Sequence, residues 1–158
     1  MKPNSTQLRN YHVETVEYQR ALVAVDIDDF TSSERAFNYA CTVARNNSME
    51  LGIVAVLETK DINVFESLSP DSMENKRLQV AHDLLLYVKK AQDYGVEHIK
   101  PILTEGQPDH VIMEKVVPDF EPDLIIVGSE TKKFLGKTVG SQAEGIVEYS
   151  PVSVIVVR

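Results

Sequence analysis

The chain has 158 residues, 43% of them hydrophobic and 25% charged, which is enough to form one globular domain with a buried core. Its 24 acidic residues exceed its 16 lysines and arginines, and the net charge of −8 disfavours binding to nucleic acids or to an anionic membrane. The single cysteine, Cys41, excludes an intrachain disulfide, and we find neither a signal peptide nor a membrane-spanning run. We therefore expect a cytoplasmic protein.

Short apolar runs alternate along the chain with segments of helical periodicity. Residues 1–17 are polar and patternless, and we expect a flexible N-terminal arm there, in front of one domain over residues 18–158. The expected strands cover residues 20–26, 51–57, 98–103, 124–127 and 152–157. The expected helices cover residues 31–46, 69–94, 109–117 and 142–149, the first of them capped by Thr31, Ser32 or Ser33.

This alternation predicts an α/β fold, a three-layer sandwich around a doubly wound, five-stranded parallel sheet of order 3-2-1-4-5. Ligands of such sheets bind beyond the carboxyl ends of the strands, at the point where the winding reverses. That switch point lies here between the first and fourth strands. Asp26 ends the first strand, Gly128 ends the fourth, and Gly140 and Ser141 open the following helix, so we expect these residues to flank one crevice.

Each of these residues has a functional and a structural interpretation, and the sequence leaves both open. Asp26 could accept a hydrogen bond from a ribose hydroxyl or an adenine amino group, or it could cap the following loop or helix. Gly128 could let a phosphate approach, or it could simply end the strand in a turn. Gly140 and Ser141 could present N–H groups to an anion, or they could form an ordinary helix cap.

Three competing motifs are incomplete. The run 136–138 reads Gly-Lys-Thr, like the end of a P-loop, but Thr131 stands where that signature needs its first glycine. Asp26 and Asp28 resemble the first motif of haloacid dehalogenase phosphatases, but Phe30 occupies the next motif position. A dinucleotide-binding glycine fingerprint is absent after the first strand. We find no positioned nucleophile or general base, so we expect little or no catalysis.

Several segments, taken together and in order, resemble the universal stress protein family. They lie at residues 22–26, 33–36, 54–58, 105–108, 122–129, 140–144 and 150–158. The resemblance covers the chain from about residue 20 to residue 158. It implies the strand order given above and a homodimer in which the last strands, residues 152–157, pair antiparallel across a two-fold axis.

In the ATP-binding branch of that family the pattern is Gly, two residues, Gly, nine residues, then Gly followed by Ser or Thr. Gly128 and Gly140 match the first and last glycines, but Thr131 replaces the second, and the loop is one residue short. The resemblance implies an adenine-nucleotide site, with ATP as its ligand. Its binding residues would be Ala24, Val25, Asp26, Val56, Gly128, Ser129, Gly140, Ser141 and Gln142.

The loop after the first strand adds carboxylates that could repel phosphates. Asp28 and Asp29 are candidate ligands for a Mg²⁺ ion that would offset this repulsion, and Lys132, Lys133 and Lys137 could contribute. Our first hypothesis is a cytoplasmic, homodimeric stress-response protein that binds an adenine nucleotide without substantial catalysis. The second is a dimeric interaction or signalling protein of the same fold with an empty pocket. A haloacid dehalogenase-type phosphatase is a distant third.

Overall fold

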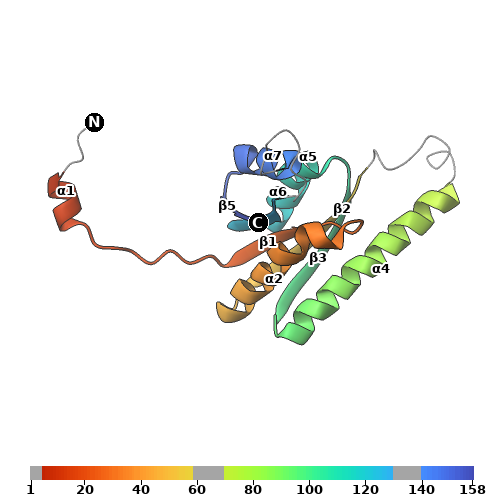
Figure 1. Cartoon of the computed structure of the whole chain (residues 1–158), viewed down its shortest axis with the longest axis horizontal. Coiled ribbons are helices and arrows are strands. Elements are labelled where there is room, and N and C mark those ends of the chain that lie inside the picture. The colour runs from red at the N-terminus through yellow and green to blue at the C-terminus, as the bar shows by residue number, and fades with distance from the viewer. Residues whose placement is uncertain (1–4, 59–69, 130–139) are drawn as a thin grey trace.

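A five-stranded parallel sheet of order β3-β2-β1-β4-β5 forms the centre of the molecule (Figure 1). The computed structural model describes residues 5–58, 70–129 and 140–158. The strands are β1 (Arg20–Val25), β2 (Glu50–Leu57), β3 (His98–Glu105), β4 (Leu124–Gly128) and β5 (Ser153–Val157). The predicted fold class and the strand order 3-2-1-4-5 are thus confirmed.

Helices cover both faces of this sheet and complete the three layers. They are α1 (Ser5–Asn10), α2 (Phe30–Asn46), α4 (Pro70–Tyr94), α5 (Pro108–Val111), the π-helical turn η2 (Ile112–Val116), α6 (Val117–Phe120) and α7 (Ser141–Tyr149). Helices α2 and α4 pack on one face, and η2, α6 and α7 pack on the other. Helix α1 stands apart from the sandwich and buries none of its residues (Figure 1).

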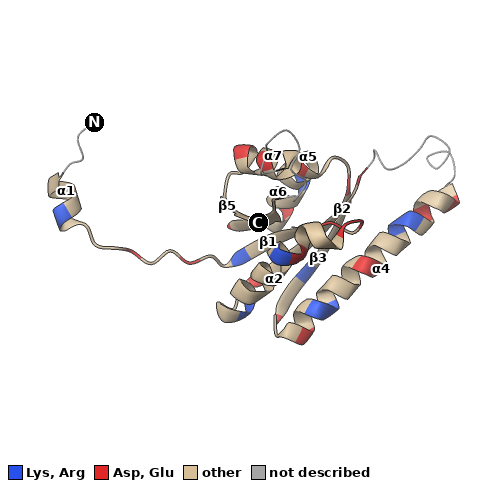
Figure 2. Cartoon of the chain, in the orientation of Figure 1, with Lys and Arg blue, Asp and Glu red and all other residues tan. Residues whose placement is uncertain are grey.

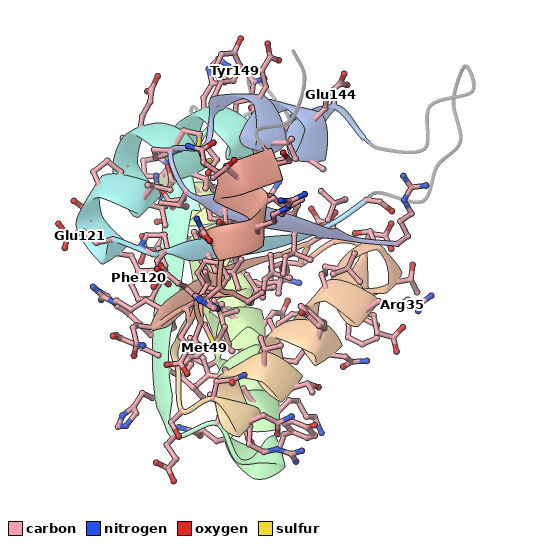
Figure 3. All side chains as sticks on the ribbon, turned by 90° about the vertical axis from the view of Figure 1, so that its left-hand side faces the viewer. Arg35, Met49, Phe120, Glu121, Glu144 and Tyr149 are labelled. Atoms are coloured by element: carbon pink, nitrogen blue, oxygen red, sulfur yellow. The ribbon has the colours of Figure 1, made fainter. Side chains whose placement is uncertain are left out.

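The central strands are buried on both faces, which explains their uninterrupted apolar sequences. Along β1, Ala21 and Val23 join the core under α2 and α4, whereas Leu22 joins the opposite core. Phe120 belongs to this second core and lies so close to Gly52 that a Cβ atom there would be 2.8 Å from its ring. Packing between β2 and α6 therefore requires a glycine at position 52 (Phe120 is labelled in Figure 3).

Strand β1 pairs with β2 on one side and with β4 on the other, and this pairing positions the candidate site. Val23 lies opposite Ile53 on β2 and opposite Ile126 on β4. Because both ladders are parallel, the carboxyl ends of β1 and β4 lie at the same edge of the sheet. The chain winds from β1 through β2 to β3 and then returns to β4, so the winding reverses between β1 and β4.

The helix boundaries differ from the expected ones, by one residue except in the third helix, and α1 was not expected in the N-terminal arm. Helix α2 begins at Phe30 with Asp29 as its N-cap residue, so none of the predicted caps occupies that position. The helix expected over residues 109–117 continues to Phe120 and contains a π-helical turn. Pro118 offers no N–H and its ring crowds the carbonyl four residues before it, so the turn ahead of it widens to the π form.

Candidate functional site

A cavity of about 130 Å³ opens where the carboxyl ends of β1, β2 and β4 meet the helices. Ala24, Val25, Asp26, Val56, Gly128 and Gln142, all predicted from the sequence, line it together with Asp28. Ser129, Gly140, Ser141 and Asp29 are not among the described residues that line it. The structure therefore brings residues from widely separated segments to one crevice at the switch point, where the topology predicts a ligand site.

The cavity has an apolar interior and a charged rim. Val54, Val80, Ile112 and Ile146 contribute from both cores. Asp26, Asp28, Glu58 and Lys76 are the charged residues that line it in the described part of the chain. The apolar interior suits a flat ring system, whereas the carboxylates favour hydrogen-bond donors over bare anions.

Asp26 shapes the loop that follows β1. Its Oδ1 atom accepts hydrogen bonds from the backbone N–H groups of Asp28 (2.9 Å) and Asp29 (3.1 Å). The capping interpretation is thus correct for this oxygen. Within the described residues, Oδ2 accepts no hydrogen bond from the protein, so the carboxylate keeps one oxygen for a donor in the cavity.

A hydrogen bond to a buried serine fixes the end of β1 against α2. The Asp26 N–H donates to the Oγ atom of Ser33 (3.1 Å), a buried residue of α2. Burial raises the pKa of Tyr87 on α4, as do the charges of Asp26 and Asp83, while the neighbouring Ser33 hydroxyl opposes the shift. The ring of Tyr87 packs edge-on against Phe37, with centroids 5.0 Å apart. These contacts hold one wall of the cavity in place.

Gly128 is required by packing between β4 and α2. A Cβ atom at this position would overlap the carbonyl oxygen of Ser32 and lie 3.4 Å from its carbonyl carbon and 3.6 Å from the Cα atom of Ser33. The first turn of α2 therefore approaches β4 more closely than any side chain at position 128 would allow. Sequence reasoning offered a phosphate contact or a plain turn for this glycine and missed the helix that faces it.

The start of α7 is tied to the end of β4. The N–H of Gly140 donates to the carbonyl oxygen of Ser129 (2.8 Å), and the Ser129 N–H donates to that of Val157 (2.9 Å). Gly140 is the N-cap residue of α7, Ser141 is exposed, and Ser129 is buried. Of the first residues of α7 and its cap, Gln142 lines the cavity, whereas Gly140 and Ser141, which were expected to flank it, are not among its described lining residues. Thr131, Gly136 and the three loop lysines lie outside the described residues.

Gln142 has a structural task that the sequence did not reveal. Its Oε1 atom accepts a hydrogen bond from the N–H of Asp109 (2.9 Å), in the first turn of α5. The Gln142 side chain therefore links α7 to α5 across the cavity wall. Its amide nitrogen could donate a hydrogen bond to a ligand in the cavity.

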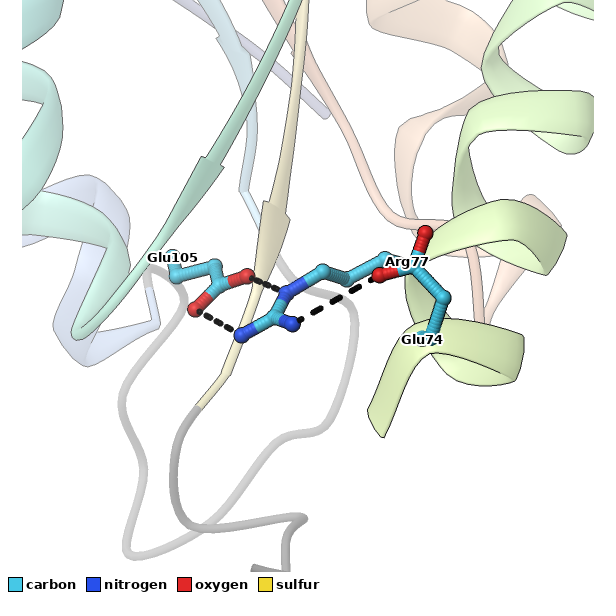
Figure 4. A network of polar contacts seen from close by, with 3 residues as sticks. All are labelled: Glu74, Arg77 and Glu105. Carbon is cyan, nitrogen blue, oxygen red and sulfur yellow. Dashed lines mark hydrogen bonds and ion pairs between the residues drawn. The ribbon is translucent and has the colours of Figure 1, made fainter. Parts of the chain in front are cut away.

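An ion pair on α4 lies close to the cavity rim and was also missed. Arg77 forms a two-pronged pair with Glu105 at the end of β3, with Nη2 to Oε2 at 3.4 Å, and Nη1 lies 3.9 Å from Glu74 (Figure 4). The hydrogen bond with Arg77 lowers the pKa of Glu105. Arg77 follows Lys76, a cavity residue, in the sequence of α4.

Metal and membrane features are absent from the described part of the chain. Over residues 5–58, 70–129 and 140–158, no three His, Cys, Asp or Glu side chains are grouped closely enough to hold a metal ion. Asp28 and Asp29 stay predicted Mg²⁺ ligands, and a bound nucleotide would have to supply the other oxygen ligands of the ion. The helices in these same ranges include none with the length and apolarity needed to cross a bilayer.

Comparison with known proteins identifies close relatives. A family model described as the universal stress protein family matches residues 17–158. A relative from Staphylococcus saprophyticus, named as a universal stress protein, is 33% identical over 146 residues, which cover 89% of this chain and 84% of the relative. The structure of the universal stress protein UspA from Lactobacillus plantarum is similar at a TM-score of 0.74 and 26% identity, covering 91% of this chain and all of that one.

A further solved structure is a universal stress protein in complex with cAMP. It is similar at a TM-score of 0.67 and 21% identity, covering 89% of this chain and 97% of that one. At this level of identity the likeness shows the fold alone.

Proposed function

The chain belongs to the universal stress protein family, and from that premise we propose that it binds an adenine nucleotide in the cavity between the ends of β1 and β4. The observation that carries the proposal is the convergence of Asp26, Val56 and Gly128 on this one cavity. A universal stress protein that shares this fold was solved with cAMP, an adenine nucleotide.

The chemistry of the cavity suggests a role for each wall. The adenine ring would lie against the apolar interior, where the backbone of Val56 offers hydrogen-bond partners. The Oδ2 atom of Asp26 would accept a hydrogen bond from a ribose hydroxyl or the adenine amino group. The phosphates would extend from Gly128 toward Ser141, where the first turn of α7 presents backbone N–H groups.

ATP is the proposed ligand, with Mg²⁺ as its counterion. Asp28 at the cavity rim offers the hard carboxylate oxygens that Mg²⁺ prefers, and Asp29 follows in the same loop, with its Oδ1 accepting a hydrogen bond from Thr31. The cation would supply charge neutralisation, which a rim containing Asp26, Asp28 and Glu58 makes necessary. The protein's own part in this proposal is to bind and orient the nucleotide. We infer that turnover is slow or absent.

We further propose that the protein is a cytoplasmic homodimer. Strand β5 lies at the edge of the sheet, and its outer side would complete a ladder with the same strand of a second copy. The single cysteine leaves no intrachain disulfide to form, which is compatible with a reducing compartment. The net charge of −8 argues against nucleic acid or an anionic membrane as a partner.

Thermal unfolding with and without Mg²⁺ and ATP tests the proposal. A ligand at 100 times its dissociation constant stabilises the folded state by about 2.7 kcal/mol, which raises the midpoint by roughly 5–11 °C in a chain of this length. Asp26→Asn should reduce that rise, because an amide holds a ribose or amino donor less strongly than a carboxylate does. Asp93→Asn, an exposed carboxylate on α4 away from the cavity, is the matched control.

A second candidate is a dimeric interaction protein of the same fold whose pocket stays empty. Thr131 in place of the family's second glycine and the carboxylates at the rim favour it. No shift at millimolar ATP, with AMP and cAMP also inert, would support this candidate over nucleotide binding.

A further inference from the structure

The N-terminal arm carries large apolar side chains that no other part of the described chain covers. Every residue from 5 to 17 is exposed, and Leu8, Tyr11, Val13 and Val16 are between 61% and 89% exposed. Isolated apolar residues are common on protein surfaces, but a cluster of this density on one short segment is typical of a contact surface. The arm also runs away from the sandwich instead of folding onto it (Figure 1).

The root of the arm is fixed, so its direction is set by the fold. The hydroxyl of Tyr18 donates to the Oγ atom of Ser153, the first residue of β5 (2.8 Å). The backbone N–H groups of Gln19 and Arg20 donate to the two carboxylate oxygens of Asp123, at 2.8 and 2.9 Å. The arm therefore leaves the body beside the edge strand β5, on the side where a second copy would add to the sheet.

The same side of the molecule carries an uncovered apolar surface on α7. Val147 is 52% exposed, and Val154 and Val156 of β5 are only partly buried on the face of the sheet that α7 covers. Tyr149, two residues further along α7, faces another direction and is not part of this surface. Figure 3 looks from the side to which the arm runs and shows α1 in front of β5, with α7 and Tyr149 above. We define Val147, Val154 and Val156 as the α7–β5 surface, which leaves the backbone edge of β5 to pair with the second copy.

Charge and length match the arm to this surface. Helix α1 contains Arg9 and no acidic residue, whereas α7 contains Glu144 and Glu148 and no lysine or arginine (Figure 2). The extended stretch from Tyr11 to the root spans roughly 25 Å, against about 17 Å for the five residues of β5. The arm is thus long enough to cross a neighbour that is docked at the β5 edge.

We propose that the N-terminal arm is exchanged between two copies of this chain, with its apolar residues packed on the α7–β5 surface of the partner. The inference rests on the proposed homodimer and is independent of nucleotide binding. This exchange gives the dimer a second contact besides the paired β5 strands. It also buries the apolar side chains of the arm, which are otherwise exposed to solvent.

Photo-cross-linking of the full chain shows where the arm lies. A benzophenone side chain placed at Val13 should yield a covalent dimer whose cross-linked peptide falls within residues 141–158. A mixture of ¹⁴N- and ¹⁵N-labelled protein distinguishes a cross-link between two copies from one within a single copy. A cross-link confined to one copy, or one that maps to α4, overturns the proposal.

Dissociation measured by sedimentation shows whether the arm contributes binding energy. Val13→Ser combined with Val16→Ser should raise the dimer dissociation constant about tenfold or more. The matched control is Leu78→Ser combined with Leu85→Ser, two leucines of α4 that are 59% and 57% exposed, and it should leave the constant unchanged. A chain that is monomeric at all concentrations overturns the arm and the dimer together. A dimer that is indifferent to the arm variant overturns the arm alone.

A charge exchange tests the orientation of the contact. Arg9→Glu alone and Glu148→Arg alone should each weaken the dimer, and the double variant should recover at least part of the loss. Failure of the double variant to recover contradicts the placement of α1 on α7. The ATP-dependent rise in melting temperature should be the same in all these variants, which keeps this test separate from that of the nucleotide site.

Discussion

Substitution of Gly128 by alanine tests the packing that shapes the cavity. The added Cβ atom would overlap the carbonyl oxygen of Ser32 and come within 3.4 Å of its carbonyl carbon. The obstacle is the backbone of α2's first turn, which cannot rotate away as a flexible side chain can. Overpacking of this kind costs about 1–3 kcal/mol, and we expect a value in the upper half of that range, about 2–3 kcal/mol.

Urea unfolding followed by circular dichroism measures this cost, and the melting temperature should fall by roughly 4–12 °C. Gly140→Ala is the matched control, since Gly140 has φ −70° and ψ 161°, a conformation open to any residue. Loss of its capping preference should cost less than about 1 kcal/mol. A Gly128→Ala variant as stable as the control would refute the close approach of α2 to β4.

Three further predictions concern single side chains. Asp26→Ala should destabilise the protein by about 1 kcal/mol in urea unfolding, because two loop N–H groups lose their acceptor, whereas Asp26→Asn keeps a carbonyl oxygen and should stay within about 0.5 kcal/mol of the wild type. The pKa of Glu105 is lowered, so its pairing with Arg77 stabilises the fold at pH values above the ordinary carboxyl pKa, and this stabilisation is lost as the pH falls through the lowered pKa. The difference in unfolding free energy between wild type and Glu105→Gln should therefore disappear between neutral and acid pH. A difference that stays constant over this range would contradict the pairing. Cys41, whose pKa is raised to about 11 by burial, should resist alkylation at pH 8 until the protein is unfolded, and rapid labelling of the native protein would contradict its burial.

The strands and their order followed from the sequence because their physical cause is local. Runs such as residues 21–25 and 124–127 are apolar at every position, as expected for a strand that is covered on both faces. The convergence of Asp26 and Gly128 then followed from topology alone, since parallel strand ends meet at one edge.

The remaining features of the site depend on contacts between distant segments. The need for a glycine at position 128 comes from the Ser32 carbonyl, which no local pattern around either residue encodes. Likewise, the bond from the Asp109 N–H to Gln142 depends on how α5 and α7 are packed together. The ion pair of Arg77 with Glu105 depends on the rotation of α4 about its axis, which is set by tertiary packing.

Titration of ¹⁵N-labelled protein with Mg²⁺ and ATP, followed by amide chemical shifts, tests the central claim most directly. Nucleotide binding at the switch point predicts that the amides of Asp26, Val56, Gly128 and Gly140 shift together and saturate with one dissociation constant. An unchanged spectrum at millimolar ATP would contradict this site. So would shifts confined to Arg20, Glu50 and His98, which begin their strands at the opposite edge of the sheet.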